Sequence, residues 1–318
     1  MKILGILVIV ICAVAALFFL AAFICFYITF YSSKKQKTVS EEYPLPPGKV
    51  YEPYHGIMLE WMKQVRTYPY EEMSITSFDG LILRGKYYEC KPGAPIELMF
   101  HGYRGTSERD LCGGVQRAFA LGRNVLLVDQ RASTSSGGHV ISFGINESRD
   151  CHTWIEHIIG RFGSDVKIIL TGISMGASTV LIAAGSTLPE NVVGVLADCG
   201  YSTARDIIRQ VIRKLGLPAD LLYPLVRFSA KLFGHFDLEE TSPLEAIKNC
   251  RIPVIFFHGK ADDFVPWEMS QVNYDACPTR KKLVLVPGAG HGLSFPADQE
   301  GYLSDLREFF PENELSVN

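Results

Sequence analysis

Residues 172–176 read Gly-Ile-Ser-Met-Gly, so that glycines stand two places before and two places after Ser174. An apolar run at 166–170 is typical of a buried strand, and a helical pattern over 175–187 overlaps the end of the pentapeptide. A sharp turn between a strand and a helix exposes a serine hydroxyl but leaves no room for side chains at the flanking positions. The placement therefore favours Ser174 as a nucleophile over a glycine-rich turn that holds an inert serine.

A serine hydroxyl is a weak nucleophile, so Ser174 needs a general base, and the base needs a partner that fixes its tautomer. Asp262 and Asp263 follow an apolar run at 254–257, and His291 lies in a glycine-rich loop after the run at 283–286. Neighbouring strand ends can bring an acid and an imidazole to one serine, in the chain order serine, acid, histidine. We expect His291 to be the base and one of the two aspartates to be its partner.

Acyl transfer also needs two backbone N–H groups that stabilise the oxyanion of the tetrahedral intermediate. One belongs to the residue after the nucleophile, here Met175, and the other to a loop after an earlier strand. The apolar run at 96–100 ends in His101-Gly102-Tyr103-Arg104-Gly105, which makes the amide of Tyr103 the second candidate. We expect His101 to order this loop rather than to act as a base.

These side chains must be positioned by a sheet. Short runs rich in Val, Ile and Leu are typical of parallel strands buried on both faces, and they lie at 96–100, 125–128, 166–170, 192–197, 254–257 and 283–286. Helical patterns alternate with them at 111–121, 147–159, 175–187, 266–275 and 297–309. Earlier, a helix at 57–66 precedes two segments, 72–78 and 81–88, that flank an Asp79-Gly80 turn. The predicted fold class is α/β, with a mostly parallel doubly wound sheet and an antiparallel N-terminal hairpin.

About residues 199–249 the strand–helix alternation is interrupted by an insertion that reads as helices at 204–215 and 219–233. An insertion at the carboxyl edge of a sheet would lie over the ligand crevice as a lid. Its apolar residues would line an acyl pocket or form the core of the lid itself; they are Leu217, Leu221, Leu222, Leu225, Val226, Phe228, Leu232 and Phe233.

The N-terminus has no Asp, Glu, Lys or Arg from residue 3 to residue 31. A helix of about 20 apolar residues crosses a bilayer, and a cleaved signal has a shorter apolar centre and a cleavage site of small residues. Because this run is longer and ends in aromatic residues, we expect a transmembrane signal anchor at 1–33. A Pro-rich linker at 34–50 and a folded domain at 51–318 follow. Lysines on both sides of the span leave the side of the membrane open.

The composition excludes several classes of protein. Of the 318 residues 47% are hydrophobic, which excludes a disordered chain, and a net charge of −3 makes nucleic acid an improbable partner. The 8 cysteines show neither CxxC nor His/Cys metal spacing, so free thiols are expected. With no zinc motif and no phosphate-binding loop in the sequence, we expect no cofactor.

Taken together, the motifs resemble those of the α/β-hydrolase superfamily, most closely a bacterial membrane-anchored branch near the monoacylglycerol lipases and serine aminopeptidase-type hydrolases. The motifs cover about residues 70–310 and are His101-Gly102-x-x-Gly105, Asp129-Gln130-Arg131, Gly172-x-Ser174-x-Gly176, Ser242-Pro243-Leu244, His258-Gly259-x-x-Asp262-x-x-Val265-Pro266 and Gly290-His291-Gly292. The resemblance implies the α/β-hydrolase fold, with Ser174 as nucleophile, Asp262 rather than Asp263 as acid, His291 as base, and the Tyr103 and Met175 amides as oxyanion donors. Residues 131–137 depart from the family pattern in lacking a histidine, which puts only the local loop shape in question.

The expected function is that of a serine hydrolase that cleaves a small-molecule carboxylic ester through an acyl-enzyme. One alternative is an aminopeptidase or amidase, in which Glu239 and Glu240 would receive the substrate ammonium. Another is a catalytically idle binding module tethered to a membrane. Dehalogenase chemistry is disfavoured because it needs a carboxylate in place of Ser174.

Overall fold

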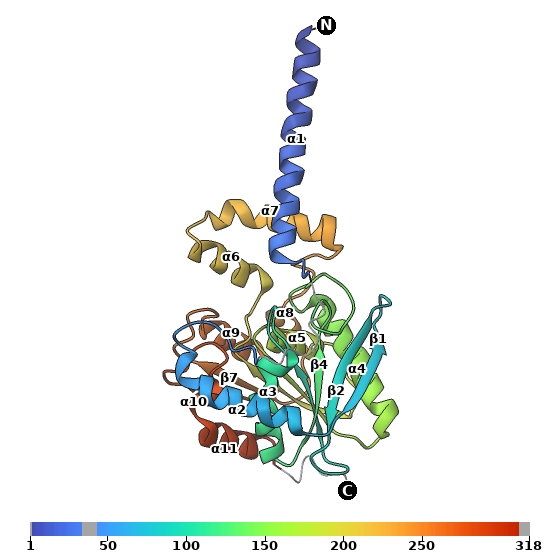
Figure 1. Cartoon of the computed structure of the whole chain (residues 1–318), viewed down its shortest axis with the longest axis vertical. Helices are drawn as coiled ribbons and strands as arrows, with labels where there is room; N and C mark the ends of the chain where they lie inside the picture. Colours follow the sequence, from blue (N-terminus) through green and yellow to red (C-terminus); the bar gives the residue numbers. More distant parts are fainter. Residues whose placement is uncertain (1, 34–42, 312–318) are drawn as a thin grey trace.

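The computed structural model describes residues 2–33 and 43–311, and its centre is one eight-stranded sheet (Figure 1). The strand order is β1-β2-β4-β3-β5-β6-β7-β8, in which β2 is antiparallel to both of its neighbours and all other pairs are parallel. The strands are β1 (Glu71–Thr76), β2 (Ile82–Tyr88), β3 (Ile96–Phe100), β4 (Asn124–Asp129), β5 (Ile168–Ile173), β6 (Val192–Asp198), β7 (Val254–Gly259) and β8 (Lys281–Val286). The prediction of a mostly parallel sheet with an antiparallel N-terminal hairpin is confirmed.

Helices cover both faces of the sheet, because its central strands are apolar on both sides. The core on one face contains side chains of α2 (His55–Thr67), α3 (Ser107–Ala120) and α11 (Gln299–Phe309). The core on the other face contains side chains of α4 (Ile145–Phe162), α5 (Met175–Ala184) and α8 (Pro243–Ile247), and α9 (Glu268–Ala276) packs against it. Two short elements, η1 (Glu52–Tyr54) and α10 (Ser294–Ala297), complete the domain.

Strand β5 differs from the sequence prediction at both ends. It begins at Ile168 rather than at residue 166, and it continues to Ile173 rather than ending at residue 170. The extension arises because β5 pairs with β3 as far as Gly172 and with β6 as far as Ile173. The strand therefore runs directly into Ser174 at the carboxyl edge of the sheet.

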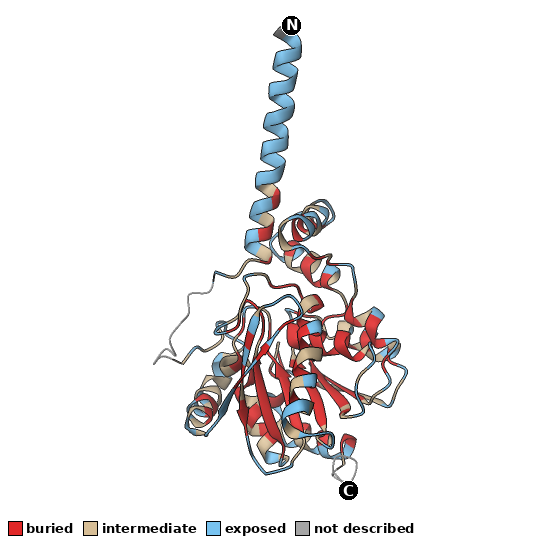
Figure 2. Cartoon of the chain, turned by 90° about the vertical axis from the view of Figure 1, so that its right-hand side faces the viewer, coloured by how far each residue is buried: buried red, intermediate tan, exposed pale blue. Residues whose placement is uncertain are grey.

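The N-terminal helix α1 (Lys2–Thr29) projects away from the domain, and α7 (Ala219–Gly234) lies across it (Figure 1). The projecting part of α1 is exposed, whereas buried residues appear near its C-terminal end, where it meets the domain (Figure 2). Ala22, Phe26 and Phe30 are among the buried residues. Residues 3–29 are long and apolar enough to cross a membrane, a test that a signal sequence also passes. Their composition is compatible with a single-pass anchor.

The C-terminal end of α1 is joined to the domain by backbone hydrogen bonds as well as by apolar contacts. The N–H of Ile141 donates to the carbonyl of Phe30 at 2.9 Å, and the N–H of Ser32 donates to the carbonyl of His139 at 2.8 Å. Phe26 and Phe30 share a hydrophobic cluster with side chains of α6 (Ala204–Lys214) and α7. The last turns of α1 are thus part of the folded core.

One prediction about a segment outside the sheet needs correction. Residues 34–42 of the expected linker lie outside the described residues, but Tyr43 and Leu45 pack against the core, and the carbonyl of Pro46 contacts Nε2 of His55 at 3.0 Å. Residues 43–50 therefore belong to the domain rather than to an extended tether.

All eight cysteines are free thiols, as the sequence analysis expects.

Candidate active site

Ser174 lies in a strained turn between β5 and α5. Its backbone φ is +56° and its ψ is −119°, a conformation that a non-glycine residue adopts only where the surrounding structure enforces it. A Cβ on Gly172 would lie 2.1 Å from the carbonyl oxygen of Gly176, and a Cβ on Gly176 would lie 2.0 Å from that of Phe100. Both glycines are therefore sterically required, as the sequence pattern predicts.

The structure brings Ser174, His291 and Asp262 together from three strand ends. Oγ of Ser174 lies 2.9 Å from Nε2 of His291, and Nδ1 of His291 lies 2.7 Å from Oδ2 of Asp262. Because a carboxylate only accepts, Nδ1 of His291 carries a proton, which leaves Nε2 to accept the serine hydroxyl proton. Asp263, the other candidate acid, is exposed. The geometry thus brings Asp262, rather than its neighbour, to the imidazole.

Asp262 is held in place by four contacts. Its Oδ1 accepts the backbone N–H groups of Phe264 at 2.9 Å and Val265 at 2.8 Å, while Oδ2 faces both His291 and His258. Burial alone would raise the pKa of Asp262, but hydrogen bonds from His258 and His291 outweigh it and hold the pKa well below its ordinary value. The carboxylate is therefore ionised at neutral pH and can stabilise an imidazolium.

His258 is a site residue to which the sequence analysis gave no role. It is fully buried, and its Nε2 lies 3.2 Å from Oδ2 of Asp262 and 2.9 Å from the carbonyl of Val265. Both partners only accept, so Nε2 carries the proton and Nδ1 accepts from Oγ of Ser270 at 2.7 Å. His258 therefore helps to hold the carboxylate of Asp262 in place. Its position at the end of β7, four residues before Asp262, is the signal that could have identified it.

The loop that carries Tyr103 passes beside the serine. A Cβ on Gly102 would lie 3.5 Å from Cβ of Ser174. Among the residues that the structure describes, the backbone N–H groups of Tyr103 and Met175 have no protein acceptor. Both amides therefore have unused donors near the nucleophile. His101 at the start of this loop is buried, and its Nε2 accepts the N–H of Gln130 at 3.2 Å. These contacts agree with a role in ordering the loop.

The same loop is hydrogen-bonded to the end of α1. The Tyr103 hydroxyl donates to the carbonyl of Thr29 at 2.7 Å, and Nη2 of Arg104 donates to the carbonyls of Ile28 at 2.8 Å and Tyr31 at 2.9 Å. The last carbonyls of a helix lack partners within the helix and carry partial negative charge. Arg104 and Tyr103 satisfy them, which couples α1 to the loop beside Ser174.

A pocket of about 180 Å³ adjoins Ser174 and His291. Its walls include Tyr51 and Met58 from the segment before β1, Tyr103, and Phe264, whose ring packs edge-on against His291 with centroids 5.1 Å apart. The sequence analysis did not predict the contribution of the segment before β1. That contribution depends on the tertiary packing of α2 and η1, for which the sequence carries no local signal.

Of the two alternatives for the apolar residues of the insertion, the structure does not support the pocket wall. Within residues 2–33 and 43–311, no apolar residue of α6 or α7 lines the pocket at Ser174. Instead Phe228 and Phe233 contact aromatic rings of α1. Glu239 is bound by Tyr223 and Arg227, and Glu240 is bound by Arg149. Neither glutamate lines the pocket, so the acidic pair is not placed to receive a substrate ammonium.

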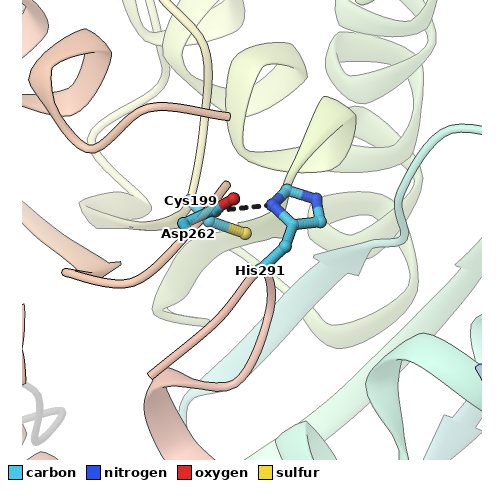
Figure 3. Close-up of side chains that lie close together, drawn as sticks. All are labelled: Cys199, Asp262 and His291. Carbon is cyan, nitrogen blue, oxygen red and sulfur yellow. Dashed lines mark hydrogen bonds and ion pairs between the residues drawn. The ribbon is translucent and has the colours of Figure 1, made fainter. Parts of the chain in front are cut away.

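Cys199 lies beside Asp262 and His291, and one polar or sulfur atom from each falls within 4.8 Å of the others (Figure 3). Such a group could hold a metal only if the sulfur were a thiolate. Burial raises the pKa of Cys199 well above its ordinary value, and the oxygen and nitrogen of the other two residues are bound to each other. The oxygen and the nitrogen are therefore already engaged with each other, and Cys199 lies beside them as a neutral thiol.

Arg131, at the start of the segment 131–137 that departs from the family pattern, forms a buried ion pair. Arg131 donates to both oxygens of Asp150 at 2.7 Å and to Asp79 at 2.9 and 3.2 Å. The side chains of Arg131 and Asp150 are each only 4% exposed. These hydrogen bonds connect the loop after β4 to the β1–β2 turn and to α4. They do not involve Ser174.

Comparison with known proteins agrees with the fold. The Bacillus subtilis protein YqkD is 30% identical over 190 residues, which are 59% of this chain and 62% of YqkD. Escherichia coli YfhR is 28% identical over 181 residues, 56% of either chain, so the match spans less than two thirds of both relatives. The Pyrococcus furiosus esterase Pf2001 superposes with a TM-score of 0.66 at 20% identity, covering 86% of this chain and 97% of that one. The profile of the alpha/beta hydrolase family matches residues 98–303, and the chain therefore belongs to that family.

Proposed function

We propose that this chain is a membrane-anchored serine hydrolase that cleaves a carboxylic ester through an acyl-enzyme. The observation that carries the proposal is the hydrogen-bonded chain from Ser174 through His291 to Asp262, with Oγ···Nε2 at 2.9 Å and Nδ1···Oδ2 at 2.7 Å. A nucleophile, a base within hydrogen-bond reach and an orienting acid are the three groups that acyl transfer requires.

The reaction follows from these positions. Oγ of Ser174 attacks the ester carbonyl carbon while Nε2 of His291 takes its proton, and the resulting imidazolium lies against the ionised Asp262. The unused N–H groups of Tyr103 and Met175 receive the oxyanion. His291 then protonates the departing alcohol as the ester C–O bond breaks, and afterwards removes a proton from the water that attacks the acyl-enzyme.

The pocket limits what the site encloses. A pocket of about 180 Å³ is smaller than the roughly 300–1,000 Å³ of pockets that enclose a whole drug-sized ligand. It therefore holds the reacting ester and its immediate neighbours, and the rest of a large substrate lies outside. The aromatic and aliphatic side chains of Tyr51, Met58 and Phe264 line part of this pocket, and such a surface suits an apolar acyl group.

Retention of α1 as an anchor is supported by the burial of its C-terminal end in the domain. Cleavage of α1 near residue 31 would remove Phe26 and Phe30, which are 6% and 0% exposed, together with the carbonyls that Tyr103 and Arg104 bind. Intact-mass measurement of the chain purified from membranes tests this part of the proposal. A mature chain that lacks the first thirty or so residues would refute it.

The ester chemistry is tested with a panel of substrates. The full chain in detergent should release p-nitrophenol from p-nitrophenyl butyrate and should not cleave amino-acid anilides at a comparable rate, since Glu239 and Glu240 are already paired with arginines. Ser164→Ala, at an exposed loop serine, serves as the matched control for Ser174→Ala. Preferential cleavage of the anilides would replace the esterase by a peptidase.

A further inference from the structure

Helix α7 carries a row of apolar side chains that faces away from the domain. Leu221, Leu225, Phe228 and Leu232 follow one another at intervals of four, three and four residues, which places them on one side of the helix. Leu221 is 73% exposed, and Leu217, just before the helix, is 48% exposed. We call these five residues the outer face of α7. The opposite side of the helix is buried against the domain and includes Tyr223, Val226 and Ala230.

Contacts with α1 fix the position of α7 along the axis of α1. The ring of Phe228 lies 5.3 Å from that of Phe18, and the ring of Phe233 lies 5.5 Å from Phe23 and 5.6 Å from Phe26. A helix crosses the hydrocarbon of a bilayer with about 20 residues. Counted from residue 3, the span ends within the turns of α1 that contact α7. Helix α7 therefore crosses α1 where the membrane boundary falls (Figure 1).

The charges around the outer face are nearly balanced. Lys231 pairs with Asp237, and Arg209 pairs with Asp220. Attraction to anionic lipid is therefore limited to Arg213 and Lys214, two exposed cations just before Leu217, and most of the binding energy of this surface comes from its apolar side chains. The exposed apolar surface of α1 continues directly into it, so the same hydrocarbon can cover both.

We propose that the outer face of α7 binds the lipid leaflet from which α1 emerges, with its apolar side chains at the boundary between headgroups and acyl chains. This inference rests on α1 being a membrane helix, as proposed above. Tyr103 lines the active-site pocket and also donates to the carbonyl of Thr29 at the end of α1. The pocket therefore lies close to the leaflet, and the ester that it receives is one carried by a membrane lipid.

Tryptophan fluorescence in vesicles tests the contact without using activity. Leu221→Trp places a new indole on the outer face, and Tyr70→Trp places one before β1, at the amino edge of the sheet and so at the opposite end of the domain. The full chain is reconstituted in phosphatidylcholine vesicles with and without bromine on the acyl chains, and the wild-type signal of the native tryptophans is subtracted. Bromine should quench at least half of the emission of Trp introduced at 221 and little of that at 70.

Equal quenching at the two positions would overturn the proposal. Carbonate extraction of the same vesicles separates this result from a failure of the anchor, because a chain that is not embedded leaves the membrane entirely. Replacing a third of the lipid by phosphatidylglycerol should change the quenching by less than a fifth, since most charges around the outer face are paired. A strong dependence on phosphatidylglycerol would contradict the apolar mode of binding.

A charge on the outer face should affect lipid substrates selectively. Leu221→Glu is expected to lower the rate of hydrolysis of mono-oleoylglycerol in vesicles by about tenfold and to leave the rate on soluble p-nitrophenyl butyrate unchanged. Val272→Glu, at an exposed apolar residue of α9, is the matched control and should change neither rate. An equal loss on both substrates, or no loss on either, would refute delivery of the ester from the leaflet.

Discussion

The substitution Asp262→Asn is informative because the surroundings of this side chain decide which way the new amide points. The backbone N–H groups of Phe264 and Val265 donate to Oδ1 at 2.9 and 2.8 Å. They need an acceptor, so the amide oxygen of asparagine takes the position of Oδ1 and its NH₂ group takes that of Oδ2. The proton on Nε2 of His258, which lies 3.2 Å from Oδ2, keeps the carbonyl of Val265 at 2.9 Å as its acceptor. That NH₂ group then faces Nδ1 of His291, which the aspartate contacts at 2.7 Å.

A donor at this position forces Nδ1 of His291 to accept, which moves the ring proton to Nε2. Nε2 lies 2.9 Å from Oγ of Ser174 and, once protonated, can no longer take the hydroxyl proton. The corresponding substitution in a serine protease triad lowers kcat about 10⁴-fold through the same change of tautomer. We expect a loss of about that size here, which corresponds to about 5 kcal/mol in activation free energy.

The assay is the rate of p-nitrophenyl butyrate hydrolysis by the full chain in detergent, with thermal unfolding to show that the variant is folded. Asp263→Asn is the matched control, because Asp263 is the exposed neighbour of Asp262 and should retain wild-type activity. An Asp262→Asn variant that keeps activity within tenfold of wild type would refute the argument from the tautomer.

The same variant tests the charge on Asp262. Because the folded-state pKa of Asp262 lies below its ordinary value, its ionised form stabilises the fold above the unfolded-state pKa of about 4, and this stabilisation is lost as the pH falls below that value. The difference in unfolding free energy between wild type and Asp262→Asn should therefore shrink between pH 6 and pH 3. A difference that grows on acidification would contradict the assigned direction of the pKa.

Three further substitutions probe the elements that hold the site. Gly176→Ala places a Cβ 2.0 Å from the carbonyl oxygen of Phe100 and should destabilise the fold by about 4 kcal/mol or more, measured as loss of folded protein. Arg131→Ala leaves Asp150 buried without its partner and should lower the unfolding free energy by about 3–5 kcal/mol in denaturant titrations. Arg104→Met removes the donors that bind the end of α1 and should lower kcat roughly tenfold with KM unchanged, less than the hundredfold or more lost with an oxyanion donor.

Matched controls exist for the first two substitutions. Gly160 lies in α4 with no atom within 4 Å of its would-be Cβ, so Gly160→Ala should stabilise the fold by roughly 0.5–1 kcal/mol. Arg161 pairs with Glu71 at 3.4 Å on the surface, and Arg161→Ala should cost no more than about 1 kcal/mol. For Arg104→Met, a rise in KM at constant kcat would show that the loop binds substrate rather than positions the oxyanion donors.

The sheet and the three residues at its edge could be predicted because their signals are local. Apolar runs define buried strands wherever they occur. The glycines around Ser174 are required by atoms four or five residues away or at the end of the adjacent strand β3. The order of Ser174, Asp262 and His291 along the chain then follows from which strand ends are neighbours. The choice of Asp262 over Asp263 came from the family resemblance, and the geometry agrees with it.

The contacts that the sequence did not reveal are all between distant segments. Amphipathic patterns indicate that α7 has an apolar side, but not that this element packs on α1 instead of on the pocket. The pocket wall formed by Tyr51 and Met58 depends on how α2 folds back onto α3, which no periodicity encodes. Glu239 and Glu240 illustrate the same limit, because their arginine partners lie 12 and 91 residues away.

The central claim is that Ser174 is the nucleophile of an acyl-transfer reaction. Its most direct test is labelling of the full chain in membranes with a fluorophosphonate, followed by mass spectrometry of the tryptic peptides. The account predicts one modified residue, Ser174, with labelling abolished in Ser174→Ala and retained in Ser164→Ala. A wild-type chain that is folded but unlabelled, or a label that persists in Ser174→Ala, would contradict it.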